Sequence, residues 1–134
     1  DRSAEILSLV HAGEGPTPRV CCDIRRLPFR NEAFDLILVI RLWHHLREEE
    51  ARAAAMDELR RVSTRYVIVS YYRQSGLHAL SRRIGSRFSK RVRINMLPPG
   101  QFEREAEEHG FAVKRQERVL PFLHAQTISL LVRK

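Results

Sequence analysis

The stretch Phe34–Ile40 is the feature that most constrains the fold. It is an almost uninterrupted apolar run of strand length, rich in branched side chains. Such runs are typical of strands that are buried on both faces, as in a parallel sheet. Arg41 ends the run, and His44 and His45 follow it. Because ligands of open α/β sheets bind just beyond the carboxyl ends of the strands, this exit is a candidate site.

A second strand is predicted at Val20–Ile24, where an apolar run ends in an acid before a loop that contains proline. Cys21 and Cys22 are adjacent on it. Neighbouring strand residues face opposite ways, so we expect two reduced core thiols. Adjacent histidines do not converge on one ion, and His44 and His45 have no third ligand near them in sequence. No metal site is therefore predicted.

The rest of the chain alternates helices and strands. Residues 13–18 contain Gly-x-Gly, but the loop follows a helix and precedes a strand, the reverse of a phosphate-binding loop. Gly110 is a stop signal for the helix before it. Helices are predicted at residues 3–11, Arg47–Val62 and Gln101–His109, and strands at Tyr66–Tyr71, Phe111–Val119 and Thr127–Arg133.

At 134 residues the chain is expected to be one α/β domain, residues 1–134. Its longest strictly aliphatic run, Leu36–Ile40, is far shorter than the roughly 20 residues of a membrane span. Asp1–Ser3 has no signal-peptide character, so a cytoplasmic location is the expectation.

Basic charge is concentrated in one segment. The net charge is +8, and the segment 73–96 is predicted to be a basic amphipathic insertion, because Leu77, Leu80, Ile84 and Phe88 have helical spacing. A lid over the active site ranks first, and attraction of an anionic partner or lipid surface ranks second. Nucleic acid ranks third, because Phe88 is its one aromatic residue. The basic residues assigned to an anionic partner are Arg82, Arg83, Arg87, Lys90, Arg91 and Arg93.

Several of these features occur together in one family. Asp23 at a strand end is followed by Leu-Pro-Phe, a polar turn, Phe-Asp-Leu, an apolar strand and the exit Leu-Trp-His-His-Leu. This order resembles the class I S-adenosylmethionine-dependent methyltransferases, especially the small-molecule branch with quinone and lipid methyltransferases. The resemblance is good over residues 1–72, looser over 97–134 and absent over 73–96. It implies a Rossmann-like, mostly parallel sheet with an antiparallel last strand.

The resemblance implies S-adenosylmethionine as the cofactor. In the family, an acid in the position of Asp1 hydrogen-bonds the ribose hydroxyls. Asp23 matches the acid that accepts a hydrogen bond from the adenine amino group, and Ile24 matches the apolar residue on the adenine ring. Cys22 lies beside them, and Arg41 lies near the expected methionine moiety. These five residues are the expected cofactor contacts.

The expected reaction is methyl transfer to a small-molecule or lipid-like acceptor. Displacement at a sulfonium needs alignment more than protein groups, and a base matters only if the acceptor must lose a proton. His45, ahead of His44, is the candidate base, although both could simply pack at the start of the next helix. Tyr71, Tyr72 and Arg73 end a predicted strand, so position makes them substrate-pocket candidates.

The family's first strand, glycine-rich loop, first helix and second strand would all precede Asp1 in this sequence. Without them the sheet has a gap between the family's third and fourth strands, and unpaired strand edges inside a core are costly. An upstream segment, a second copy or a rearranged fold would close it. Two alternative functions stay open: a non-catalytic methyltransferase-like interaction or regulatory module, and an RNA-binding or RNA-modifying protein.

Overall fold

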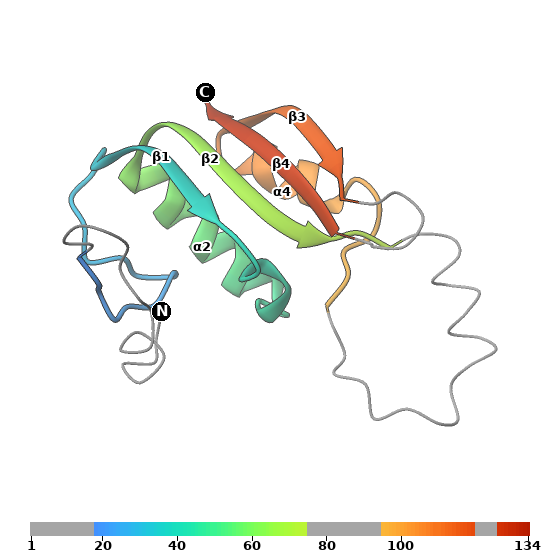
Figure 1. Cartoon of the computed structure of the whole chain (residues 1–134), viewed down its shortest axis with the longest axis horizontal. Coiled ribbons are helices and arrows are strands. Elements are labelled where there is room, and N and C mark those ends of the chain that lie inside the picture. The colour runs from blue at the N-terminus through green and yellow to red at the C-terminus, as the bar shows by residue number, and fades with distance from the viewer. Residues whose placement is uncertain (1–17, 75–94, 120–125) are drawn as a thin grey trace.

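The computed structural model describes residues 18–74, 95–119 and 126–134 (Figure 1). They form a four-stranded sheet in the order β1-β2-β4-β3. β1 and β2 are parallel, and β4 is antiparallel to both β2 and β3. The α/β class and the antiparallel last strand are therefore confirmed. The elements are β1 (Phe34–Val39), η1 (Trp43–His45), α2 (Glu49–Val62), β2 (Ser63–Tyr72), α4 (Gln101–Glu108), β3 (Phe111–Arg118) and β4 (Gln126–Arg133).

Helix α2 follows from its charges and its apolar stripe. Glu49 and Glu50 lie in its first turn and Arg60 and Arg61 in its last, so both ends complement the helix dipole. Its buried side chains pack on the sheet, and α4 lies on the same side (Figure 1). The core lies between these helices and the strands, with Trp43, Met56, Leu59, Val67, Val69, Tyr71, Phe102, Phe111 and Leu131 fully buried.

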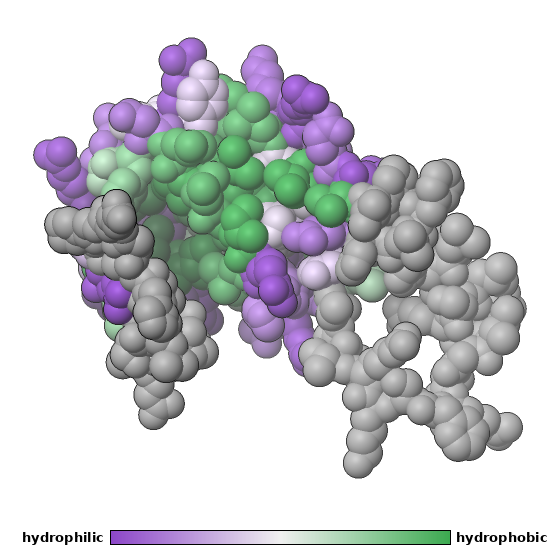
Figure 2. Space-filling model, in the orientation of Figure 1, coloured by the Kyte–Doolittle hydropathy of each residue, from purple (hydrophilic) through white to green (hydrophobic). Residues whose placement is uncertain are grey.

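The opposite face of the sheet is apolar and open. Leu36, Leu38 and Ile40 alternate along β1 and its exit, and they are 50%, 61% and 51% exposed. Leu38 pairs with Ile68 of β2, which pairs in turn with Leu130 of β4, so the apolar surface continues across the sheet. Figure 2 shows this surface over the strands. The expectation that Phe34–Ile40 is buried on both faces is wrong, because no described helix covers this side.

The predicted strand Val20–Ile24 is also wrong. In this stretch the structure has only an isolated bridge between Asp23 and Arg26 and no strand. A strand needs a neighbouring strand to satisfy its backbone groups, and none of the described strands pairs here. Cys21 is exposed and Cys22 half-buried, so the two free thiols are not core residues as expected.

Some predictions fall outside the described residues. These are the helix at 3–11, the Asp1 cofactor contact, and most of the basic insertion with its six assigned basic residues. Within the ranges that the structure describes, no helix is long and apolar enough to cross a bilayer.

Candidate functional site

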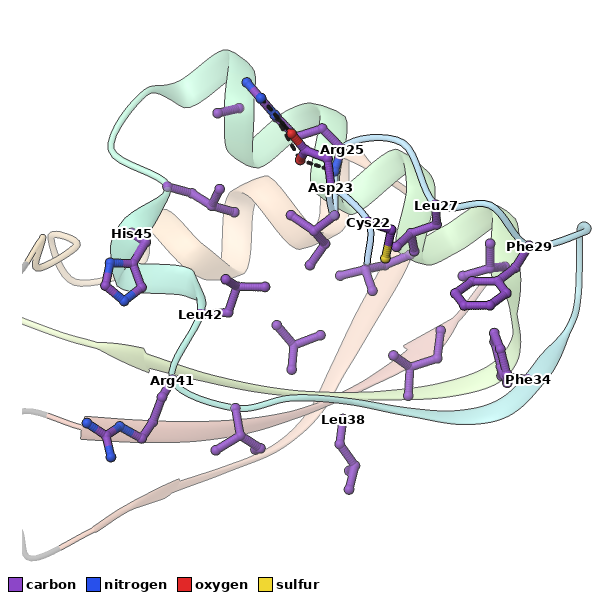
Figure 3. A pocket seen from close by; sticks show the side chains of 18 of the residues that line it. Cys22, Asp23, Arg25, Leu27, Phe29, Phe34, Leu38, Arg41, Leu42 and His45 are labelled. Atoms are coloured by element: carbon purple, nitrogen blue, oxygen red, sulfur yellow. Dashed lines mark hydrogen bonds and ion pairs between the residues drawn. The ribbon is translucent and has the colours of Figure 1, made fainter. Parts of the chain in front are cut away.

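A groove with a cavity volume of about 990 Å³ separates the segment 22–29 from β1 (Figure 3). Ile24 and Leu27 line one side, and Ile37 lines the other. Leu59 of α2 also lines the groove, which continues past the end of β1 to residues 41–48. Its walls are largely apolar, and its polar groups gather at the carboxyl end of the strand, where α/β folds bind ligands.

The chain leaves β1 through a left-handed residue. Arg41 has a φ of 58°, a conformation that costs a residue with a side chain about 1–3 kcal/mol. Its backbone N–H donates a 2.8 Å hydrogen bond to Oγ of Ser70, a buried residue of β2. This bond supports the bend, which turns the chain out of the sheet into η1. His45 consequently lines the groove (Figure 3).

The two histidines lie side by side. The ring centroids of His44 and His45 are 4.1 Å apart, and His44 meets the ring of Tyr72 edge-on at 5.1 Å. Burial lowers the pKa of His44 below its ordinary value, and the charges of His45 and Arg41 lower it further. His44 is therefore a neutral imidazole near pH 7, able to accept a proton.

Asp23 is held by its neighbour Arg25 (Figure 3). Oδ1 accepts from the Arg25 backbone N–H at 3.0 Å and from Nε at 3.1 Å, while Oδ2 accepts from Nε at 3.2 Å and Nη2 at 2.7 Å. A carboxylate offers about four lone-pair sites, and Arg25 contacts both oxygens with three N–H donors. Another donor at Asp23 must therefore share or displace the guanidinium.

The three substrate-pocket candidates at the end of β2, Tyr71, Tyr72 and Arg73, lie in different surroundings. Tyr71 is buried and stacks on Phe102 of α4, with centroids 4.1 Å apart. Burial, and then the charge of Glu103, raises the pKa of Tyr71 to about 12. Tyr71 is thus a core residue rather than a pocket residue, because its side chain points to the helix side of the sheet. Tyr72 lies beside His44, and Arg73 forms an isolated bridge with Leu97.

Comparison with known proteins agrees with this geometry. A family model described as "Methyltransferase domain" matches residues 1–66. No curated protein matches the sequence. Among solved structures, magnesium protoporphyrin IX methyltransferase from Synechocystis PCC 6803, with bound SAH, superposes with a TM-score of 0.68 at 19% identity, over 84% of this chain and 49% of that one. The described residues therefore have the class I methyltransferase fold, and the first half of the chain matches the methyltransferase family model.

Two further structures show the same fold. A SAM-dependent methyltransferase from Methanosarcina mazei has a TM-score of 0.74 at 11% identity, over 100% of this chain and 79% of that one. A protein from Pyrococcus horikoshii OT3 has a TM-score of 0.67 at 22% identity, over 86% of this chain and 58% of that one. The chain spans about half the length of the Synechocystis and Pyrococcus proteins.

Sequence reasoning missed the side chains that anchor the groove. Glu58 and Arg61 on α2 bond to the backbone of the segment 22–29, at Leu27 and Phe29. Arg52 on the same helix donates to the carbonyl of Arg47. The sequence signal was an acid and a base three residues apart near a helix end. Ser70, the acceptor for Arg41, carried no signal.

Proposed function

We propose that this chain forms the cofactor and acceptor pocket of an S-adenosylmethionine-dependent methyltransferase that acts on a small-molecule or lipid-like acceptor. The observation that carries the proposal is the groove between the segment 22–29 and β1. It lies in a class I methyltransferase fold, and the similar Synechocystis enzyme has SAH bound. The largely apolar lining supports an acceptor of low polarity.

The residues present fit the cofactor in chemical type. Ile24 offers a half-buried apolar surface for the adenine ring. Asp23 offers a carboxylate that can accept from the adenine amino group once the Arg25 side chain gives up one of its hydrogen bonds to that carboxylate. The Arg41 guanidinium, at the carboxyl end of β1, suits a carboxylate such as that of the methionine moiety. S-adenosylmethionine would supply an electrophilic methyl group there. Cys22 also lines the groove, whereas Asp1 lies outside the described residues.

His45 and His44 would serve an acceptor that loses a proton. His45 is exposed in the groove lining and is the group that an acceptor would meet first. His44, with its lowered pKa, lies behind it at ring-contact distance. An imidazole at this position could take up the proton released by methylation of a phenol or a carbon acid.

We also infer that more polypeptide completes the sheet at β1. The edge of β1 away from β2 has no partner among the described strands, and Leu36, Leu38 and Ile40 leave a large apolar surface exposed. An upstream segment of a longer protein is the favoured occupant, because this chain covers only 49% of the similar Synechocystis enzyme. A second copy of this chain is the alternative.

Titration of S-adenosylhomocysteine into the protein by calorimetry tests the function, with light scattering to count the copies per particle. Saturable binding at one site per chain is the expected result. A folded protein that binds no S-adenosylhomocysteine would instead favour the non-catalytic module. A flat salt response in an RNA-retention assay would remove the RNA alternative.

A further inference from the structure

Glu58 and Arg61 form an ion pair on one face of the last turns of α2. Nε of Arg61 donates to Oε1 of Glu58 at 2.8 Å, and Nη2 donates to Oε2 at 2.8 Å. Both side chains are partly shielded from solvent. A pair at this spacing usually contributes only a few tenths of a kcal/mol to a helix. Its other contacts suggest a different use.

Each member of the pair also reaches the loop that closes the groove. The backbone N–H of Leu27 donates to Oε2 of Glu58 at 2.6 Å, and the carbonyl of Leu27 accepts from Nη2 of Arg61 at 2.9 Å. Both polar groups of one backbone residue are thus held by the pair. Nη1 of Arg61 donates further to the carbonyl of Phe29 at 2.7 Å and to Oδ1 of Asn31 at 3.0 Å.

These contacts matter because the loop has no strand or helix of its own. Residues 22–29 contain only one isolated bridge, so the backbone groups of Leu27 and Phe29 must find partners elsewhere. Leu27 and Phe29 both line the groove, directly across from β1. The pair therefore sets how far this wall stands from the strand.

We propose that Glu58 and Arg61 are positioning residues that hold the segment 22–29 as one wall of the ligand pocket. We call this set of contacts from Glu58 and Arg61 to the segment 22–29 the clamp. The identity of the ligand rests on the proposed function, but the clamp itself does not. Fixing Leu27 fixes the backbone that leads back to Ile24 and Asp23, the residues assigned to the adenine. Neither Glu58 nor Arg61 lines the groove, so they act through the loop.

The test compares four variants by amide hydrogen exchange and by S-adenosylhomocysteine titration, after thermal unfolding has shown that each is folded. Glu58→Ala and the milder Arg61→Lys break the clamp. The double exchange E58R/R61E restores an ion pair on the helix but leaves the Leu27 N–H without its acceptor. Asp57→Asn is the matched control. Asp57 is the neighbouring residue on α2, but it pairs with His109 at the C-terminus of α4 and not with the segment 22–29.

We expect the Leu27 amide to exchange at least about tenfold faster in the first three variants, with unchanged exchange in the middle of α2. S-adenosylhomocysteine affinity should fall by about tenfold in the same variants and stay unchanged in Asp57→Asn. If E58R/R61E restores protection at Leu27, or if Glu58→Ala leaves it unchanged, the pair is only a helix salt bridge and the proposal is wrong. Absence of binding by the unaltered protein would count against the proposed function, while the exchange data would still decide the clamp.

Discussion

Arg52 of α2 and Glu105 of α4 form a buried ion pair that joins the two helices and the loop after η1. The Arg52 side chain donates to the carboxylate of Glu105, with the shortest contact 2.7 Å from Nη2 to Oε1. The residues are only 3% and 7% exposed. Nη1 donates in addition to the carbonyl of Arg47 at 2.8 Å. The pair thus ties the rim of the groove to the core.

Removing one partner of this pair should be strongly destabilising. Glu105→Ala leaves the Arg52 guanidinium buried without its counter-charge, and we expect a loss of about 3–5 kcal/mol in the free energy of unfolding, measured by urea denaturation. The double variant R52M/E105L should lose less than Glu105→Ala, because it leaves no unpaired charge. The exposed pair of Asp57 and His109 is the control, and Asp57→Asn should cost less than about 1 kcal/mol. Equal losses in Glu105→Ala and Asp57→Asn would contradict this account.

Asp23 and Arg25 should have opposite effects on cofactor affinity. Asp23→Ala removes the proposed acceptor for the adenine amino group, so S-adenosylhomocysteine should bind about tenfold more weakly. Arg25→Ala removes the three side-chain contacts that the guanidinium makes with the Asp23 carboxylate, so binding should tighten. Isothermal titration with the unaltered protein as reference measures both. Weaker binding in Arg25→Ala would mean that the guanidinium itself contacts the ligand.

Glu58 should make the stability of the protein depend on pH in the acid range. The hydrogen bond from Arg61, followed by that from the Leu27 backbone, holds the pKa of Glu58 below its ordinary value of 4.5. The unfolded chain therefore binds the proton more tightly than the folded one. The contribution of Glu58 is complete above pH 4.5 and is lost as the pH falls through its folded pKa. Urea denaturation across this range should show a weaker pH dependence in Glu58→Gln, and an identical slope would refute the assignment.

His44 should titrate below the ordinary histidine range. Its pKa is lowered from 6.5 by burial and then by His45 and Arg41. NMR titration of the ring C–H signals, assigned with His44→Asn, should give a midpoint under 6.5 for this residue. The lowered value means that His44 stabilises the fold less as the pH falls below 6.5. A midpoint at or above 6.5 would remove the argument for a neutral imidazole at this site.

The parts of the fold that the sequence predicts are those whose periodicity is local. The helix at Arg47–Val62 and the strand at Phe34–Ile40 were found within a few residues of α2 and β1. Val20–Ile24 has strand composition, but a strand exists only where a neighbour supplies hydrogen bonds, and composition cannot show that neighbour. The same reason explains Leu38, which the sequence predicts as a core residue. It is exposed because no described helix covers that face of the sheet.

The candidate site was predictable only where it depends on position along a strand. The sequence placed His45 and Arg41 at the end of β1, and both line the groove. It predicted Tyr71, at the end of the next strand, as a pocket residue, but the alternation of β2 turns that side chain towards Phe102 and the core. The clamp from Glu58 and Arg61 spans about thirty residues of chain, and such pairings are set by the tertiary fold.

The central claim is that the groove between the segment 22–29 and β1 binds the cofactor. The most direct measurement is a titration of S-adenosylhomocysteine into the ¹⁵N-labelled protein, followed by backbone chemical shifts. The account predicts saturable changes at Asp23, Ile24 and Arg41, with little change at β3 on the far edge of the sheet. Saturable changes centred on β3 or α4, or no change at all in a folded protein, would contradict it.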